Sequence, residues 1–259
     1  MTTPEQCRLG LRIFTEIPRP AEKELRALSD AGSCDLSDVM RGCGVMDSGL
    51  RPAYTPMKRL FGTAITVDLT PGDGLLLRAA VDAARPGDVI VVNGHGETSR
   101  AVLGGVIAMH MVHAGVAGLI VDGAVRDAGE FRELGFPVYA RAVTPRSGST
   151  FAGWGEVNVP VACGGTVVFP GDVVVGDEEG IAVVPRLWAG EVARSVGRAG
   201  HPTFEPGTIL QKLRELPADA RVLGIDRVHR AVAERAGIII NDTYEQEPGP
   251  TGPGRKQDQ

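Results

Sequence analysis

The 259-residue sequence is poor in cysteine and aromatic residues, and it carries no excess of positive charge. Its four cysteines, Cys7, Cys34, Cys43 and Cys163, form no Cys-x-x-Cys pair. This favours reduced thiols over a disulfide framework or a zinc site. The formal net charge is −5, and no basic cluster with interleaved aromatic residues is present, so no nucleic-acid partner is expected.

Long apolar runs are also missing. No stretch approaches the ~20 residues needed to cross a bilayer. The acids Glu5 and Glu16 argue against a secretion signal, so we expect a cytoplasmic protein with no membrane partner. The short Gly94-His95-Gly96 segment is no dinucleotide fingerprint, and no phosphate-binding loop is found.

The apolar residues that are present suffice for a substantial core. Hydrophobic residues make up 43% of the chain and charged residues 23%, which favours one domain with extensions over two full domains. We predict a single domain over residues 1–244, with its core at about 36–185. The segment 245–259 is rich in proline, glycine and charge, and is predicted to be a disordered tail.

Secondary structure is predicted from apolar spacing and from turn and cap residues. Helices are expected at 19–31, at 35–40 with Asp35 as a cap, at 75–84, at 129–134 and at 187–197. Strands are expected at 62–69, 89–92, 118–121, 137–140, 166–169, 172–176 and 181–184. The segment 94–97 is expected to be a loop, and residues 144–155 a lid or an intersubunit loop.

A pair of glycines, Gly104 and Gly105, interrupts a helical pattern that runs from Ser99 to His113. Each glycine costs about 1 kcal/mol in a helix interior, so we favour a helix that begins at the pair. The free amides of Gly105, Val106 and Ile107 would then suit a carboxylate. The alternative is that these glycines merely allow close helix packing.

The run from Gly118 to Asp127 indicates a buried strand followed by a turn, which presents Arg126 and Asp127 side by side. A guanidinium can hold a carboxylate through two parallel hydrogen bonds, and a carboxylate is a hard ligand for Mg²⁺ or Mn²⁺. Together they could bind an anionic oxo-acid on a metal. The alternative is a structural ion pair at the surface.

Other candidate residues have plain structural explanations. His110 and His113 could bind a transition metal, but packing against the core is favoured because no third ligand is near. His95 is a possible proton carrier in a glycine-flanked loop. Cys163 has no recognisable base and is interpreted as a small core residue.

Seven segments, in this order and at these spacings, carry a resemblance to a known family. They are Ser37-Asp38, 62–67, 86–89, Ala101-x-x-Gly104-Gly105, 118–127, 157–161 and 170–185. Over about residues 36–185 the chain resembles the family that includes the regulator of ribonuclease activity A and the class II pyruvate aldolases. Those aldolases act on 4-hydroxy-4-methyl-2-oxoglutarate and 4-carboxy-4-hydroxy-2-oxoadipate, and they also decarboxylate oxaloacetate.

The resemblance implies an α/β fold, a β/β/α sandwich of the swivelling-domain type, with N-terminal helices and a C-terminal helical extension. It also implies a homo-oligomer, a trimer or a hexamer of paired trimers, with the site between neighbouring subunits. Asp127 would anchor Mg²⁺ or Mn²⁺, Arg126 would contact the substrate, and the turn from Gly104 to Ile107 would hold the pyruvate carboxylate. The implied function is a metal-dependent carbon–carbon lyase acting on a 2-oxo acid.

The sequence departs from the aldolase pattern at two points. Many family aldolases have an acid where this chain has Gly105, and Glu97 is the candidate to replace it, although Glu97 could equally be an exposed loop acid. After Trp188 no position matches the glutamate that a neighbouring aldolase subunit contributes. The alternative function is therefore a non-catalytic regulator that binds a ribonuclease or a helicase.

Overall fold

The computed structural model describes residues 10, 12–151 and 154–199, all within one compact unit that spans residues 1–201. None of the helices described there is long and apolar enough to cross a membrane. The predicted tail at 245–259 and the predicted domain end at 244 lie outside the described residues and stay predictions.

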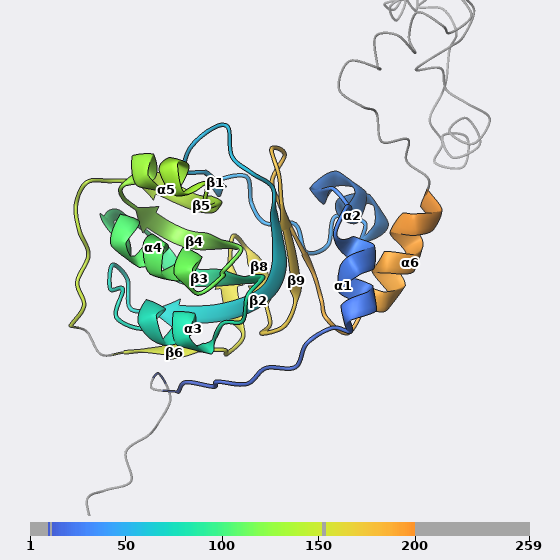
Figure 1. Ribbon diagram of the computed structural model, residues 1–259, viewed down its shortest axis with the longest axis horizontal. Helices are drawn as coiled ribbons and strands as arrows, with labels where there is room; N and C mark the ends of the chain where they lie inside the picture. Colours follow the sequence, from blue (N-terminus) through green and yellow to red (C-terminus); the bar gives the residue numbers. More distant parts are fainter. Residues whose placement is uncertain (1–9, 11, 152–153, 200–259) are drawn as a thin grey trace, which may run out of the picture. The chain divides into compact units, whose positions relative to one another are not determined.

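The described chain forms strands and helices in the order of an α/β protein (Figure 1). The strands are β1 Arg51–Pro52, β2 Leu60–Leu69, β3 Asp88–Ala101, β4 Gly118–Val125, β5 Val138–Val143, β6 Gly155–Val157, β7 Val161–Cys163, β8 Thr166–Val168, β9 Val173–Gly176 and β10 Ile181–Val184. The helices are α1 Glu22–Leu28, α2 Ser33–Val39, α3 Leu77–Ala83, α4 Gly105–His113, α5 Ala128–Leu134 and α6 Ala189–Ala199.

A mixed eight-stranded sheet organises the molecule, with strand order β1-β5-β4-β3-β2-β9-β10 and β6 paired to β2. Strands β2, β3, β4 and β5 are parallel neighbours, and α3, α4 and α5 connect each to the next. Such parallel connections need a crossover, and here all three helices lie on one face of the sheet (Figure 1). The carboxyl ends of the parallel strands therefore meet along one edge, where ligand sites of α/β proteins commonly form.

Alternating residues of the parallel strands divide the core between two faces. Ile65 and Ile90 pack with the helices, as does the fully buried Phe131 of α5. Ala64 and Val91 point the other way, toward the β7–β8 hairpin. The layers are thus hairpin, sheet and helices, which confirms the predicted β/β/α sandwich.

A third apolar cluster joins the remaining helices to the far strands of the sheet. Leu28 of α1, Leu36 of α2 and Ala189 of α6 are completely buried with Val173 and Val175 of β9. Figure 1 shows the three helices together beside β9. The predicted N-terminal helices and the start of the C-terminal helical extension are present.

The segment before α1 lies along the sheet as an N-terminal arm, which we define as residues 12–19. Arg12 forms a two-pronged ion pair with Glu156, at 2.5 and 2.8 Å. Arg19 forms the same kind of two-pronged ion pair with the buried Asp88, at 2.5 and 2.7 Å. The arm is therefore fastened to the sheet through two carboxylates distant in sequence.

The start of the second helix differs from the prediction. The helix begins at Ser33 rather than at Asp35, and Gly32 is its N-cap. Asp35 lies in the first turn and accepts a hydrogen bond from the Gly32 amide at 3.1 Å. Ser33 is also bound by Asp177, a long-range contact that local spacing cannot reveal.

The third strand is also longer than predicted. Residues 94–97, predicted as a loop, belong to β3, which runs on to Ala101 and so takes in the first residues of the helical pattern that starts at Ser99. The pairing with β4 is irregular there, with Glu97 opposite Gly123 and Ala101 opposite Ala124. Because β4 continues past Gly123, β3 can pair with it as far as Ala101. This strand pairing overrides the helical spacing of the apolar residues in the sequence.

Candidate functional site

The two glycines do mark the start of a helix, as predicted. Helix α4 begins at Gly105, and Gly104 is its N-cap in an extended conformation. A β-carbon on Gly104 would lie 2.2 Å from Asp127 Oδ2 and 2.9 Å from Arg126 Nε. Glycine at 104 thus leaves room for the Asp127 and Arg126 side chains, which the loop after β4 brings against the start of the helix.

The loop after β4 turns through Asp127, whose backbone is left-handed, with φ 59° and ψ 39°. This turn points the carboxylate back at α4, so that Oδ2 accepts a hydrogen bond from the Gly105 amide at 3.1 Å. The same oxygen lies 3.4 Å from Arg126 Nε. The carboxylate is held between a guanidinium and the positive end of a helix, which fixes its position and direction.

The Gly105 amide is therefore not free, which corrects one part of the predicted cradle. Ala108 is the first residue of α4 whose amide reaches the N-cap, donating to the Gly104 carbonyl at 3.2 Å. The amides of Val106 and Ile107 lie in the first turn, where the helix itself offers no acceptor. A substrate carboxylate can be met by these two amides.

A pocket of about 220 Å³ opens beside this helix start. Four of the residues that the sequence predicts to bind substrate line it: Gly104, Val106, Ile107 and Arg126. The segment 147–150 closes the pocket from the region that was predicted to be a lid or an intersubunit loop. Backbone hydrogen bonds with Ala101 tie this segment down, through Arg146 O at 2.9 Å and Gly148 N at 2.8 Å.

Glu97 does not line this pocket. It sits in the irregular part of β3, opposite Gly123. Its carboxylate accepts the amide of Ser99, and hydrogen bonds from the Ser99 side chain and backbone lower the pKa of Glu97. A carboxylate held in this way is a weaker base, so the geometry gives Glu97 no part in the pocket.

A different acid, Glu130 of α5, lies beside the missing side chain of Gly105. A β-carbon on Gly105 would be 1.4 Å from Glu130 Oε2 and 2.5 Å from Glu130 Cδ. The Glu130 carboxyl group thus fills the space that a side chain at 105 would need. Sequence reasoning missed it; the only available signal was an acid three residues after Asp127 at the start of a predicted helix.

The two carboxylates fit a hard divalent cation. Mg²⁺ in proteins commonly keeps several waters and takes one or two carboxylates, and Asp127 and Glu130 both approach the Gly104–Gly105 backbone. Among the described residues there is no group of three or more histidine, cysteine or acidic side chains placed to hold a metal. A cation here would be bound largely through water, with Asp127 as its anchor.

The remaining candidate side chains lie outside the pocket. His95 has a positive φ of 56° and its Nε2 lies 3.1 Å from Asp68 Oδ1. His110 and His113 are both exposed, so the prediction that they pack against the core is wrong. Cys163 is fully buried, and burial raises the pKa of its thiol, in agreement with its interpretation as a core residue.

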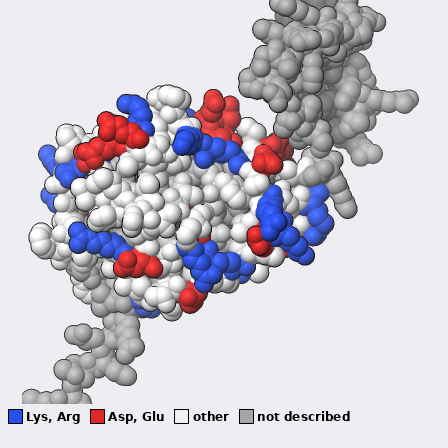
Figure 2. Space-filling view, viewed as in Figure 1, with Lys and Arg blue, Asp and Glu red and all other residues white. Residues whose placement is uncertain are grey.

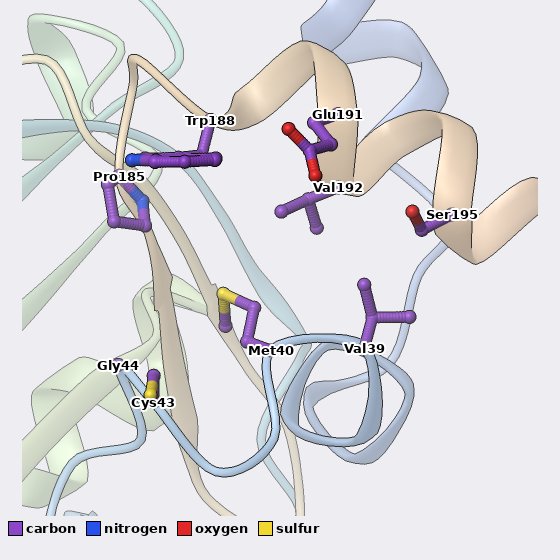
Figure 3. Close-up of a pocket in the computed structure, with 9 residues that line it drawn as sticks. All are labelled: Val39, Met40, Cys43, Gly44, Pro185, Trp188, Glu191, Val192 and Ser195. Atoms are coloured by element: carbon purple, nitrogen blue, oxygen red, sulfur yellow. The ribbon is translucent and has the colours of Figure 1, made fainter.

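A larger pocket of about 290 Å³ lies between α2 and α6 (Figure 3). Met40, Trp188 and Val192 give it a mainly apolar lining, and Glu191 is the one acid among the described residues that line it. No arginine or lysine is among those lining residues. It offers nothing for an anionic substrate, in contrast to the smaller pocket beside Arg126.

Comparison with known proteins identifies the family. Residues 33–183 match the family model RraA-like, described as Aldolase/RraA. The chain belongs to the RraA-like family. A relative from Halalkalibacterium halodurans, named "Putative 4-hydroxy-4-methyl-2-oxoglutarate aldolase", is 37% identical over 151 residues, covering 58% of this chain and 71% of the relative.

Solved structures of RraA-like proteins have the same fold. The RNA-processing inhibitor RraA from Thermus thermophilus is 32% identical, with a TM-score of 0.55, and the match covers 60% of this chain and 93% of that one. RraAS2 from Streptomyces coelicolor, described as an unusual member of the RNase ES inhibitor RraA family, is 27% identical, with a TM-score of 0.64 and coverage of 78% and 100%. The family thus contains proteins named as aldolases and proteins named as inhibitors.

Proposed function

We propose that this RraA-like protein is a divalent-metal-dependent carbon–carbon lyase that releases pyruvate from a 2-oxo acid, by aldol cleavage, by decarboxylation of oxaloacetate, or both. The observation that carries the proposal is that Arg126 and the first turn of α4 line one pocket, while Asp127 contacts both Arg126 and the Gly105 amide. The aldolase names of relatives support the same chemistry.

The chain's own groups divide the work of binding. The amides of Val106 and Ile107 receive the carboxylate of the 2-oxo acid at the positive end of α4. Arg126 presents its planar guanidinium to the adjacent oxo group, where negative charge develops as the carbon–carbon bond breaks. When bound, Mg²⁺ or Mn²⁺ would supply Lewis-acid chemistry to this reaction.

The two acids would hold the cation, and one of them would also transfer protons. Asp127 is fixed by the Gly105 amide and by Arg126, so it keeps a defined direction without relying on the ligand. Glu130 lies against the neighbouring Gly105 and is exposed, so its carboxylate would be the group that accepts a proton at the site. Glu130 thereby takes the role that an acid at 105 has in the aldolase pattern.

We further propose that the site works in a cytoplasmic homo-oligomer, a trimer or a hexamer. Helix α4 exposes three apolar side chains, Val106, Met109 and Val112, with 60%, 46% and 38% of their surface accessible. Exposed apolar groups gathered on one helix favour contact with another protein surface. Because Val106 also lines the pocket, a neighbouring subunit placed there would help to complete the site.

Release of pyruvate from oxaloacetate tests the lyase. The purified chain is mixed with oxaloacetate and Mg²⁺ or Mn²⁺, with and without a chelator, and pyruvate is followed by a coupled assay. We expect turnover that the chelator abolishes and that fresh metal restores. Pyruvate formation no faster than in a metal-only control, with every divalent ion tried, would rule out the lyase function.

A regulator that binds a ribonuclease or a helicase is the second candidate, supported by the RraA inhibitors with the same fold. Figure 2 shows acidic and basic side chains interspersed around the visible face rather than one large patch of a single sign. Such a surface suits a protein partner more than a nucleic acid. Tight binding to a ribonuclease, combined with no turnover of 2-oxo acids, would favour this function.

A further inference from the structure

The pocket beside Arg126 has a second guanidinium, that of Arg78. Arg78 comes from α3, an element that contributes no other residue to the described lining. Leu77 and Ala80 of the same helix are buried against the sheet, whereas Arg78 is exposed on the pocket side. Two arginines from two different elements therefore face one small cavity.

The two arginines differ in whether an acidic side chain lies next to them. Arg126 lies 3.4 Å from an oxygen of Asp127, on the side of the pocket where α4 begins. Among the described residues, Arg78 forms no ion pair and no side-chain hydrogen bond. The positive charge of Arg78 is thus left for a ligand or for solvent.

The rest of the described lining supplies no negative charge. It consists of apolar and glycine residues and of three hydroxyl residues, Ser147, Ser149 and Thr150. The nearby Asp73 is buried and already accepts hydrogen bonds from Leu75, Ser149 and Phe151. Two like charges at one cavity repel each other, and a ligand with two separated anionic groups relieves that repulsion.

We propose that Arg78 is a specificity-determining residue that binds an anionic group at the end of the substrate remote from its 2-oxo group. This inference rests on the proposed function, because it takes the 2-oxo acid end to lie at Arg126 and α4. A guanidinium holds a carboxylate through two parallel hydrogen bonds and so selects for it by shape as well as charge. The volume of about 220 Å³ falls below the ~300 Å³ at which pockets for drug-sized ligands begin, which suits a small di-anion.

Two ligands that differ only at the remote end test the proposal. 2-Oxoglutarate and 2-oxopentanoate have the same five-carbon chain, which ends in a carboxylate in the first and in a methyl group in the second. Their binding to the full chain with Mn²⁺ present is measured by calorimetry. We expect the wild-type protein to bind 2-oxoglutarate at least about tenfold more tightly.

Arg78→Gln should remove that preference and leave the affinity for 2-oxopentanoate within about twofold of wild type. Arg78→Lys should recover part of the preference, because it keeps the charge without the fork. Arg146→Gln is the matched control: Arg146 is exposed next to Ser147 but does not line the pocket, so this variant should behave as wild type.

Equal binding of the two ligands by the wild type, or an equal loss of both in Arg78→Gln, would overturn the proposal. So would a wild type that binds neither ligand. A ligand preference that depends on Arg78, in a protein that turns over no oxaloacetate, would leave this inference standing and remove the lyase. Chelator-sensitive turnover of oxaloacetate in a protein that does not prefer 2-oxoglutarate would support the lyase and rule out the role of Arg78.

Discussion

Asp127 shows how one backbone angle sets the chemistry of the site. A left-handed conformation costs a residue other than glycine about 1 kcal/mol or more, although aspartate tolerates it better than most. Here the left-handed conformation turns the Asp127 carboxylate toward the amide of Gly105, which lies 22 positions earlier in the sequence. The cost is offset by an ion pair and a helix-end hydrogen bond, which fix a carboxylate oxygen beside the start of α4.

The first prediction concerns that oxygen. Asp127→Asn retains a side-chain oxygen for the Gly105 amide but removes the negative charge that would hold a cation. We expect an intact fold and a loss of Mn²⁺ affinity of at least about 100-fold, since even the partners of metal ligands are commonly worth about 10- to 100-fold. Calorimetry with Mn²⁺ and circular dichroism provide the two measurements. Unchanged Mn²⁺ affinity would show that the cation is held elsewhere.

The second prediction concerns the neighbouring guanidinium. Arg126→Lys keeps a positive charge but loses the planar fork that matches an oxo-acid. We expect kcat/KM for oxaloacetate to fall at least about tenfold, which corresponds to roughly 1.4 kcal/mol of transition-state stabilisation. Steady-state kinetics at saturating metal would measure it. A lysine variant as fast as the wild type would mean that Arg126 does not contact the substrate.

The third prediction concerns the acid beside Gly105. Glu130→Gln should weaken Mn²⁺ binding about tenfold or more, whereas Glu133→Gln, an exposed acid on the same helix, should not change it. Gly105→Asp alone forces two carboxyl groups into one space, because Glu130 Oε2 lies 1.4 Å from the point that a β-carbon at 105 would occupy. The double variant Gly105→Asp/Glu130→Ala should recover binding that Glu130→Ala loses. If Glu130→Gln binds Mn²⁺ like wild type, the acid has no part in the metal site.

Among the elements, those with a strong local signal were predictable from sequence. The glycine pair predicted the start of α4. The apolar run from Gly118 predicted β4, so Arg126 and Asp127 could be placed at a strand end. The far part of β3 was not predictable, because its pairing depends on irregular register with β4. Glu130 was missed for a related reason: its closeness to Gly105 arises only once Asp127 turns α5 back toward α4.

The fourth prediction concerns an ion pair between neighbouring strands. Arg141 of β5 binds the buried Asp122 of β4 and also Asp47, at 2.7 Å. Arg141→Met leaves the Asp122 charge buried without its partner, which commonly costs about 3–5 kcal/mol. Urea unfolding should show a loss of that order, and Asp122→Asn in the same chain should recover part of it.

The same arginine makes stability depend on pH. Hydrogen bonding to Arg141 lowers the pKa of Asp47, so the stabilisation that Asp47 provides is complete above its ordinary pKa of about 3.9. It is lost as pH falls through the lowered value. Unfolding free energies at pH 6 and pH 3 should therefore differ more for the wild type than for Arg141→Met. An equal pH dependence in the two proteins would contradict the pairing.

At the scale of the whole molecule, three apolar clusters on two faces of one sheet leave one helix face uncovered. Val106, Met109 and Val112 of α4 remain exposed, although Ala108 and Met111 of the same helix are completely buried. A helix that is apolar on its outer side as well as its inner side is suited to a second contact. The candidate pocket adjoins that side.

The fifth prediction follows from this exposed face. Met109→Glu changes a half-exposed side chain that does not line the pocket, so it should leave the monomer folded. We expect it to shift the protein to smaller species in sedimentation velocity and to lower turnover with it. Glu133→Gln serves again as the surface control. A single monomeric species in the wild type would remove the proposed assembly.

The N-terminal arm sets an order of events during synthesis. Residues 12–19 leave the ribosome before their carboxylate partners, Asp88 and Glu156, which are translated some 70 and 140 positions later. The arm therefore cannot dock until the sheet it fastens has been made, since chains fold as they emerge from the N-terminal end. Until then Arg12 and Arg19 have not met these two carboxylates, so a protease that cleaves after arginine reaches them more easily on the nascent chain than on the finished protein.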